Sequence, residues 1–370
     1  MRKLFLCLIA GISLSSNAQD GMLDHFSNYD YRSIGPAGMS GRVTSIDVVR
    51  ENPQIIFAAT ASGGLWRSNS GGIDWEPVFD DQPTQSIGSV AIYQKNPSIV
   101  WAGTGEGNPR NSHNSGRGIF KSIDGGDTWE FMGLKETKGV HRVIIHPDDP
   151  NIVYAAATGS AWGPNKERGV YMTKDGGENW EQILYTNDTT GCADLVMDPS
   201  NPNKLIASMW QHLRHPWTFT SGGPGSGLHI TYDGGKTWKK LGEKEGLPGG
   251  EIGRAGLAFA PSSPNIVYAL VESKKTGFYR STDGGKSWQL RSTENIGNRP
   301  FYYADIFVDP KNENRIYNLY SVVSRSEDGG KTFQTILPYY GVHPDHHAWY
   351  IHPDDPDFMI DGNDGGINIT

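Results

Sequence analysis

The chain has 370 residues and contains no low-complexity segment or charge block that would act as a linker, which favours one large domain. Its formal net charge of −8 argues against nucleic acid and anionic membranes as partners. Only 2 cysteines are present, so the fold cannot depend on a disulfide framework.

The N-terminus has the pattern of a secretory signal peptide. Two basic residues precede an apolar run over 4–14, and small residues follow it. The run is too short to form a stable transmembrane helix, and the sequence offers no second candidate. We therefore expect a signal peptide over 1–18 and a β-propeller domain over 19–370, exported to the periplasm, the cell surface or the medium. Cys7 lies in the apolar run, so the mature chain keeps only Cys192.

The rest of the chain is divided into β-rich units. Each unit begins with an apolar alternation such as 43–48, passes through a turn that usually contains proline, and enters a second β-rich run such as 55–60. Short runs such as 169–173 predict a third strand, and runs such as 238–241 predict a fourth. The turns between first and second strands recur at Asn52-Pro53, Asn96-Pro97, Asp149-Pro150, Asn201-Pro202, Ser263-Pro264, Lys311-Asn312 and Asp355-Pro356.

Between the third and fourth strands, the phrase Ser/Thr-x-Asp-Gly-Gly-x-x-Trp recurs about every 50 residues. Gly-Gly supplies the positive φ of a tight hairpin, and the Asp can accept the N–H groups of the turn. The Trp begins the fourth strand and can pack between units. We therefore assign these residues structural roles and no catalytic role. The phrase occupies residues 122–129, 173–180, 231–238 and 281–288, with weaker copies at 68–75, where Ser70 replaces Asp, and at 326–333, where Phe333 replaces Trp.

This phrase resembles the Asp-box, or bacterial neuraminidase repeat, of sialidases, sortilins and the xyloglucan-degrading family 74 glycoside hydrolases. The resemblance covers almost the whole mature chain and implies an all-β fold, a β-propeller with four-stranded antiparallel blades. It implies no single activity, because such folds host many functions. Further motifs resemble large bacterial proteins of the sortilin-like and glycosyl-hydrolase-like kind, at residues 34–36, 103–106, 222–228, 299–303, 345–347 and 362–366.

The number of units predicts seven blades, and the last unit has runs for only three strands. The N-terminal phrase at 31–35 resembles the fourth-strand phrase at 238–242 and could complete this blade, which would close the ring and remove its open edges. The alternative is that Thr370 marks a fragment of a longer, multi-propeller protein. Both interpretations stay open at this point.

Antiparallel strand order places the proline turns and the Asp-boxes on one face of the propeller and the other connections on the opposite face. The first face is short and repetitive, so we expect His146 and His352, in its His-Pro-Asp-Asp-Pro turns, to be turn residues. The second face receives long, dissimilar loops, where we expect function to lie. These loops are 104–118, 158–169, 209–227, 242–253, 291–303 and 337–347.

Aromatic and basic side chains in these loops suit a sugar ring or a peptide side chain. Trp162, Trp210 and Trp217 lie outside the repeats and are candidate stacking residues, with Arg214 and Arg299 in the same set of loops. The alternative is that these tryptophans hold the long loops against the blades.

The first strands of the blades are expected to begin at one level beside the central channel. This arrangement would bring unlike titratable groups together, as an active site, a polar ligand site or a water-filled channel would require. The residues at this level are Arg42, His141, Arg142, Asp194, Arg254, Tyr303, Asp305, Asp345, His346 and His347.

Glycoside hydrolysis needs two carboxylates that face each other across the scissile bond. The candidate catalytic residues are Asp345, Asp194, Asp305 and Glu106, of which Asp345 is the first choice. The resemblance to family 74 weakens in the first blade, where the family has Thr-Asp-x-Gly-Gly and this chain has Ala61 in place of the Asp.

A sialidase would need an arginine triad and a tyrosine nucleophile assisted by a carboxylate. Arg42, Arg254 and Arg299 supply the first residue type, and Tyr302 or Tyr303 supplies the second. Their order along the chain does not follow the sialidase pattern.

A metal site is the third chemistry, suggested by the short cluster at 343–347. Adjacent His346 and His347 on a strand point to opposite faces, so at most one of them points inward. We therefore expect neither a metal nor another cofactor.

Together these features favour an exported, sortilin-like propeller that binds a glycan or a peptide on the face opposite the Asp-boxes. The alternative is a glycoside hydrolase of the xyloglucanase-like or sialidase-like kind with paired carboxylates. The expected ligand-binding residues are Trp162, Trp210, Trp217, Arg42, Arg214, Arg254, Arg299, Tyr303, His346 and His347.

Overall fold

The structure is a computed structural model that describes residues 42–109 and 113–370. The predicted signal peptide at 1–18 and the predicted closing strand at 31–35 lie outside the described residues. The described chain is nearly all β-structure, which confirms the predicted fold class. Its helical segments are two single 3₁₀ turns, at Lys135–Thr137 and Glu243–Glu245.

The strands form seven antiparallel sheets, the blades, each made of strands that follow one another in the chain. Blades 1 and 2 consist of β1 (Val43–Val48), β2 (Ile56–Thr60), β3 (Leu65–Ser68) and β4 (Glu76–Pro77), and of β5 (Ile87–Ile92), β6 (Val100–Thr104), β7 (Ile119–Ser122) and β8 (Glu130–Phe131). Blades 3 and 4 consist of β9 (Val140–Ile145), β10 (Val153–Ala157), β11 (Gly169–Thr173) and β12 (Glu181–Leu184), and of β13 (Thr190–Asp198), β14 (Asn201–His215), β15 (Thr218–Ser221), β16 (Gly227–Thr231) and β17 (Lys239–Leu241). Blades 5 and 6 consist of β18 (Ala255–Phe259), β19 (Val267–Val271), β20 (Gly277–Ser281) and β21 (Gln289–Ser292), and of β22 (Ile306–Asp309), β23 (Asn312–Leu319), β24 (Val323–Ser326) and β25 (Gln334–Leu337). Blade 7 consists of β26 (His346–Ile351), β27 (Met359–Asn363) and β28 (Gly366–Ile369).

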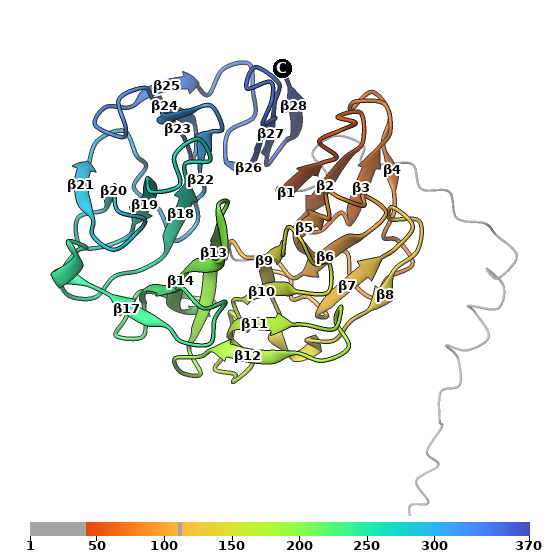
Figure 1. The fold of residues 1–370 in the computed structure, drawn as a ribbon, viewed down its shortest axis with the longest axis horizontal. Helices are drawn as coiled ribbons and strands as arrows, with labels where there is room; N and C mark the ends of the chain where they lie inside the picture. The colour runs from red at the N-terminus through yellow and green to blue at the C-terminus, as the bar shows by residue number, and fades with distance from the viewer. Residues whose placement is uncertain (1–41, 110–112) are drawn as a thin grey trace, which may run out of the picture. The chain divides into compact units, whose positions relative to one another are not determined.

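The blades are arranged around a central axis, with the first strand of each blade innermost (Figure 1). The predicted count of seven blades and the three strands predicted for the last blade are both confirmed. Blade 7 packs against blade 1 through contacts of β1 with β26 and β27. A Cβ built on Gly362 of β27 would lie 2.6 Å from Val43 Cγ1, so the glycine permits this close packing.

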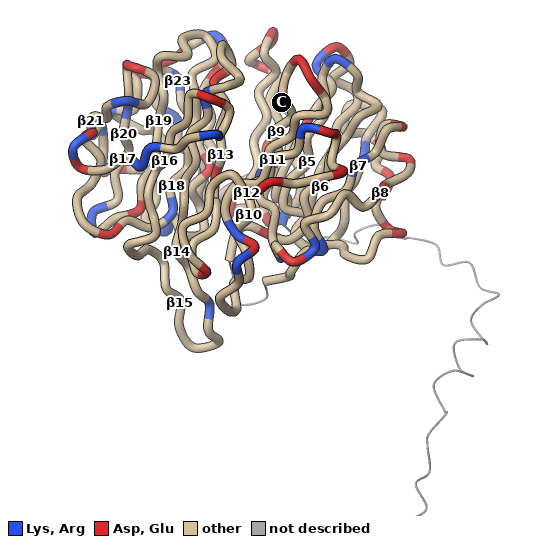
Figure 2. Tube along the Cα trace, turned by 60° about the horizontal axis from the view of Figure 1, so that its bottom comes forward, with Lys and Arg blue, Asp and Glu red and all other residues tan. Residues whose placement is uncertain are grey.

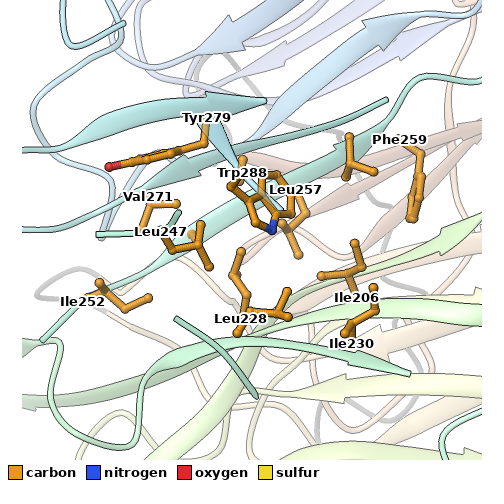
Figure 3. Close-up of a cluster of buried hydrophobic side chains, with 14 residues drawn as sticks. Ile206, Leu228, Ile230, Leu247, Ile252, Leu257, Phe259, Val271, Tyr279 and Trp288 are labelled. Carbon is orange, nitrogen blue, oxygen red and sulfur yellow. The ribbon is translucent and has the colours of Figure 1, made fainter. Parts of the chain in front are cut away.

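The hydrophobic cores lie between neighbouring blades, because each sheet is covered on both faces. The second strands β2, β6, β10 and β19 are accordingly buried at every residue. Between blades 4 and 5, Ile206 and Leu228 pack against Leu257 and Trp288 (Figure 3). Burial of each such side chain contributes about 1.5–3 kcal/mol, so the interfaces between blades provide much of the stability.

Short side chains on the innermost strands join adjacent blades through hydrogen bonds to backbone. In blade 1, Thr44 Oγ1 donates to Ile87 O at 2.7 Å, and Asp47 Oδ2 accepts Ile92 N–H at 2.7 Å. In blade 2, Ser89 Oγ accepts the N–H of Val143 from blade 3 at 3.1 Å. These bonds use backbone groups that face the channel and fix the relative height of the innermost strands.

The Asp-box turns have the predicted structure. In the third-blade copy, Asp175 Oδ1 accepts Asn179 N–H at 2.9 Å, and the left-handed φ angles of 75° and 105° fall on Gly176 and Gly177. Trp180 Nε1 donates to Met132 O of blade 2 at 2.7 Å, so the box tryptophan contacts the preceding blade as expected. The box aspartates therefore order the turn.

We predict that Asp233→Ala lowers the melting temperature by a few degrees, because Asp233 accepts Thr237 N–H at 2.9 Å and the Thr237 hydroxyl. Differential scanning calorimetry measures this change. The matched control is Asp74→Ala, an exposed aspartate of the first box, where Ser70 takes over the turn bond. An equal loss in both variants would contradict the assigned role of Asp233.

The same aspartates predict a pH dependence. Hydrogen bonds from Asn179 and Thr237 lower the pKa of Asp175 and Asp233 to about 2, below the unfolded value of about 3.9. Their stabilisation is therefore present above pH 4 and is lost as the pH falls towards 2. The difference in melting temperature between wild type and an Asp175→Ala/Asp233→Ala variant should shrink over this range. A difference that stays constant from pH 6 to pH 2.5 would refute the prediction.

Candidate functional site

The two faces of the propeller carry different connections, as predicted. The Asp-box face carries the turns between first and second strands and the Asp-boxes, and the loop face carries the remaining connections. On the loop face, the segment 209–227 was predicted as a loop but contains a β-hairpin, because β14 continues to His215 and pairs with β15. This hairpin extends from the body of the propeller (Figure 2).

At the loop-face end of the channel, a chain of polar contacts crosses the ring. Arg254 Nη1 donates to Asn108 Oδ1 at 2.6 Å, and Arg254 Nη2 donates to His141 Nε2 at 2.9 Å. Asn108 Nδ2 lies 3.2 Å from His347 Nδ1, and His347 Nε2 lies 3.1 Å from Asp364 Oδ1. The chain joins blades 2, 3, 5 and 7, and all its members except Asp364 are buried.

The donors in this chain fix the tautomer of His347. Arg254 has only donors, so it must face the amide oxygen of Asn108, and the amide nitrogen must then donate to His347 Nδ1. His347 therefore carries its proton on Nε2 and donates it to Asp364. Burial lowers the pKa of His347, opposed by the hydrogen bond to Asp364, so the ring is neutral near pH 7.

Two groups of ion pairs complete the layer. Arg42 pairs with Glu106 and donates to the hydroxyl of Tyr302. Arg142 pairs with Asp194 at 3.0 Å and also with Asp305, so it bridges blades 3, 4 and 6. Burial lowers the pKa of Arg142, but the charges of Asp305 and Asp194 outweigh this effect and raise it above its usual value.

The expected convergence of polar residues at the channel therefore occurs, but as a buried and paired layer. Of the four candidate carboxylates, Glu106, Asp194 and Asp305 are buried in these arginine pairs. A carboxylate held in this way is poorly placed to exchange protons with a substrate. The sequence left open a water-filled channel with solvated charges; at this level the three carboxylates are at most 7% exposed, whereas Arg142 keeps 22% of its side chain exposed.

Asp345 is the one candidate carboxylate that is half-exposed. Its backbone has a φ of 68°, which is uncommon for a residue other than glycine and occurs at functional sites. The Tyr303 hydroxyl donates a hydrogen bond to Asp345. Burial, together with this hydrogen bond, raises the pKa of Tyr303. Asp364 N–H donates to Asp345 O at 3.1 Å, so two carboxylate residues are neighbours on this part of blade 7.

Asp364 was missed from the sequence. The signal was present in the Asn-Asp-Gly-Gly turn at 363–366, which follows a strand and lies on the loop face. The predicted opposite orientation of the two histidines is observed, because His346 Nδ1 contacts Asp361 at 2.7 Å while His347 contacts Asn108. No group of three or more potential ligands with metal-site geometry occurs within residues 42–109 and 113–370.

The candidate stacking tryptophans differ in exposure. Trp217, at the tip of the β14–β15 hairpin, is 81% exposed and stacks on His215 at 5.5 Å, and Trp162 is 40% exposed. Trp210 lies in β14 and is fully buried beneath Arg254, with His212 stacked on it at 4.2 Å. In this conformation Trp210 presents no ring to a ligand and instead anchors the hairpin, as the alternative interpretation proposed.

A pair of phenylalanines that sequence reasoning also missed joins the hairpin of blade 4 to the loop between blades 5 and 6. Phe219 of the hairpin and Phe301 lie 5.2 Å apart. The guanidinium of Arg214 lies 5.3 Å from the Phe219 ring, and that of Arg299 lies 5.5 Å from the Phe301 ring. Arg214 and Arg299 lie in two different predicted loops and are 85 positions apart in the chain. Only the folded chain shows that these two loops come together.

The histidines of the proline turns have the predicted structural role. His146 Nδ1 accepts Asp148 N–H at 3.1 Å, and His352 Nδ1 accepts Asp354 N–H at 3.2 Å. His352 Nε2 also lies 3.1 Å from Arg50 O, which links blade 7 to blade 1.

Cys192 is buried and unbonded to another cysteine. Among the residues that the structure describes, no helix is long and apolar enough to cross a membrane.

Comparison with known families identifies the repeats. The family described as "Sortilin, neurotensin receptor 3" matches residues 63–213 and 117–247, and the BNR/Asp-box repeat matches 279–290. A xyloglucanase from Paenibacillus sp is 24% identical over 359 residues, in a match that covers 85% of this chain and 33% of the xyloglucanase. The chain thus spans about a third of that relative's length.

Solved structures show the same fold. The GH74 xyloglucanase from Xanthomonas campestris has a TM-score of 0.66 at 16% identity, over 92% of this chain and 53% of that one. A structure titled "YCF48 bound to D1 peptide" has a TM-score of 0.59 at 17% identity, over 92% of this chain and 96% of that one. The repeats, the seven blades and these matches agree: the chain belongs to the Asp-box β-propeller proteins, in the group that resembles sortilin and the family 74 glycoside hydrolases.

Proposed function

We propose that this protein is an exported recognition module whose loop face binds a glycan or peptide ligand. The observation that carries this proposal is that most of the candidate acidic residues are buried in ion pairs. Glu106, Asp194 and Asp305 are buried in arginine pairs, whereas aromatic rings and arginines remain accessible around them. A surface of this kind offers contact area and hydrogen-bond donors but few free acids or bases.

The proposed ligand surface is centred on the β14–β15 hairpin. Trp217 and Trp162 provide exposed rings, and Arg214 and Arg299 provide guanidinium groups held in place by stacking on phenylalanines. Aromatic faces stack on the C–H face of a sugar or on a peptide side chain, and guanidinium groups donate to hydroxyl or carbonyl oxygens. Arg214 and Arg299 stack on phenylalanines and Trp217 stacks on His215, so binding would order few side chains.

The related proteins support ligand binding by such a ring. The YCF48 structure, whose chain is matched over 96% of its length, holds a bound peptide, and the matching family is that of sortilin, neurotensin receptor 3. Export is part of the proposal and rests on the signal-peptide pattern at 1–18, with the mature domain over 19–370.

A glycoside hydrolase is the second candidate, and one observation favours it. Asp345 is half-exposed on the loop face, is hydrogen-bonded to Tyr303 and lies next to Asp364. Asp345 and Asp364 are neighbours through a backbone hydrogen bond, and glycoside hydrolysis requires a pair of carboxylate residues at the ligand surface. The xyloglucanase match adds weight, although Ala61 replaces the aspartate of the family's first-blade motif.

We predict that Trp217→Ala and Trp162→Ala each weaken ligand binding about fivefold to tenfold, since an aromatic stacking contact contributes about 1 kcal/mol. Wild type is first screened against xyloglucan oligosaccharides, other plant glycans and a peptide array, and hits are measured by calorimetry. The control is Tyr232→Ala, an exposed aromatic side chain on the Asp-box face. Wild-type affinity in both tryptophan variants would contradict the proposed surface.

If the protein hydrolyses a glycan, Asp345→Ala should reduce product release about a hundredfold or more, as expected for a general acid or base. The same variant should keep its affinity for the glycan, because the aromatic surface is unchanged. Product analysis and calorimetry on one sample separate the two functions. Binding without product in wild type would leave the recognition module, whereas equal product from wild type and variant would remove Asp345 from catalysis.

A further inference from the structure

The central channel has a different character below the buried layer. A cavity of about 500 Å³ is lined by the first strands of all seven blades. Along β13 exposure increases towards the Asp-box face: Cys192 and Ala193 are buried, Val196 and Met197 are half-buried, and Pro199 after the strand is exposed. Strands β5 and β18 are buried throughout, but Pro261, which follows β18 and lines the cavity, is exposed at the same face. The cavity is therefore a cup that is closed at the loop face and open at the Asp-box face.

The walls of the cup are largely apolar. Val196, Leu257, Phe259 and Phe307 are among the residues that line it. From Asp194 at its closed end to Pro199 at its rim, the wall follows β13 for roughly 16 Å at about 3.3 Å per residue. These dimensions and this lining are typical of sites for small organic molecules.

The closed end of the cup is polar and carries an unused acceptor. Arg142, Asp194, Asp305 and His347 line it. Asp305 is 3% exposed, and its Oδ1 pairs with Arg142, but its Oδ2 has no hydrogen-bond partner among the residues that the structure describes. A buried carboxylate oxygen that lacks a donor is costly, which points to a ligand group that donates to it.

The unpartnered oxygen and the charges around it indicate the kind of group that would bind there. Arg142 carries one positive charge, Asp194 and Asp305 carry two negative charges, and the neutral ring of His347 adds none. Arg254 donates to Asn108 and His141, and its positive charge also acts on Asp305 and Asp194. With Arg254 included the charges near the closed end balance, but Asp305 Oδ2 remains a carboxylate oxygen without a donor beside apolar walls. A charged donor makes the strongest hydrogen bond to such an oxygen.

We propose that the cup binds a primary ammonium group attached to an apolar body, with the ammonium donating to Asp305 Oδ2 and the body against the walls. A free alkylamine and the lysine side chain of a partner peptide share this chemistry, since both have an alkyl stem and an ammonium that is charged at pH 7. This site is separate from the proposed ligand surface, which lies on the other face.

The test is calorimetric titration of the full chain with hexylamine, 1-hexanol and hexanoate at pH 7. Hexylamine should bind, and the alcohol and the carboxylate should bind roughly tenfold to a hundredfold more weakly, because they lack the charged donor. A capped tripeptide with a central lysine, compared with its norleucine analogue, distinguishes the two sources of the ammonium group. Equal binding of amine and alcohol, or no binding of hexylamine at millimolar concentration, would overturn the proposal.

Variants locate the site. Asp305→Asn should weaken hexylamine binding by at least about tenfold, whereas Asp309→Asn should leave it unchanged. Asp309 is a matched control, because it is equally buried on β22 and pairs with Arg315 at 3.1 Å but does not line the cavity. If Asp305→Asn fails to fold, Val196→Phe tests the same site by filling the cup from its wall. Unchanged binding in Val196→Phe, or equal loss in Asp309→Asn, would contradict the assignment.

Discussion

The ion pairs of Arg142 with Asp194 and Asp305 are the constraint on which the architecture of the channel depends. They join blades 3, 4 and 6, which are far apart in the chain, at a level where all three side chains are largely withdrawn from water. A buried charge is tolerated only with a partner, so the three blades must keep their spacing once the ring has formed. The same contacts close one end of the channel and leave the other end open.

This constraint shapes what the protein can do. In a propeller, the innermost strand ends meet at one point, and charged groups placed there are available for chemistry only if they remain accessible. Here Arg42, Glu106 and Arg254 also make ion pairs or hydrogen bonds within the layer. The accessible polar and aromatic groups of the loop face therefore lie further from the axis, on the hairpin of blade 4 and at Asp345 on blade 7. On the loop face, the fold thus separates a structural centre from a peripheral surface of aromatic and basic groups.

The sequence predicted the repeating part of the molecule well, because each blade is specified locally. The Asp-box fixes a hairpin through bonds within eight residues, and the alternating runs fix the strands, so blade number, strand order and faces followed. It predicted the channel residues as a set but not their pairing, since Arg254 meets Asn108 across 146 positions. The exposure of Trp210 was misjudged for a related reason. The extension of β14 into a hairpin depends on its pairing with β15, and no local sequence motif predicts that pairing.

The buried layer also determines how the two ends of the channel relate to each other. A ligand on the loop face and a ligand in the cup would lie on opposite sides of side chains whose hydrogen bonds already have fixed directions, such as Asn108 between Arg254 and His347. If the Asn108 amide were reversed, its NH2 group would face the N–H groups of Arg254, and its oxygen would face the unprotonated Nδ1 of His347. Both contacts would be unfavourable, so this layer has one low-energy arrangement. Coupling between distant sites requires an element with two arrangements of similar free energy. A layer with a single arrangement separates the two ends, so the ligands proposed for them would bind independently of each other.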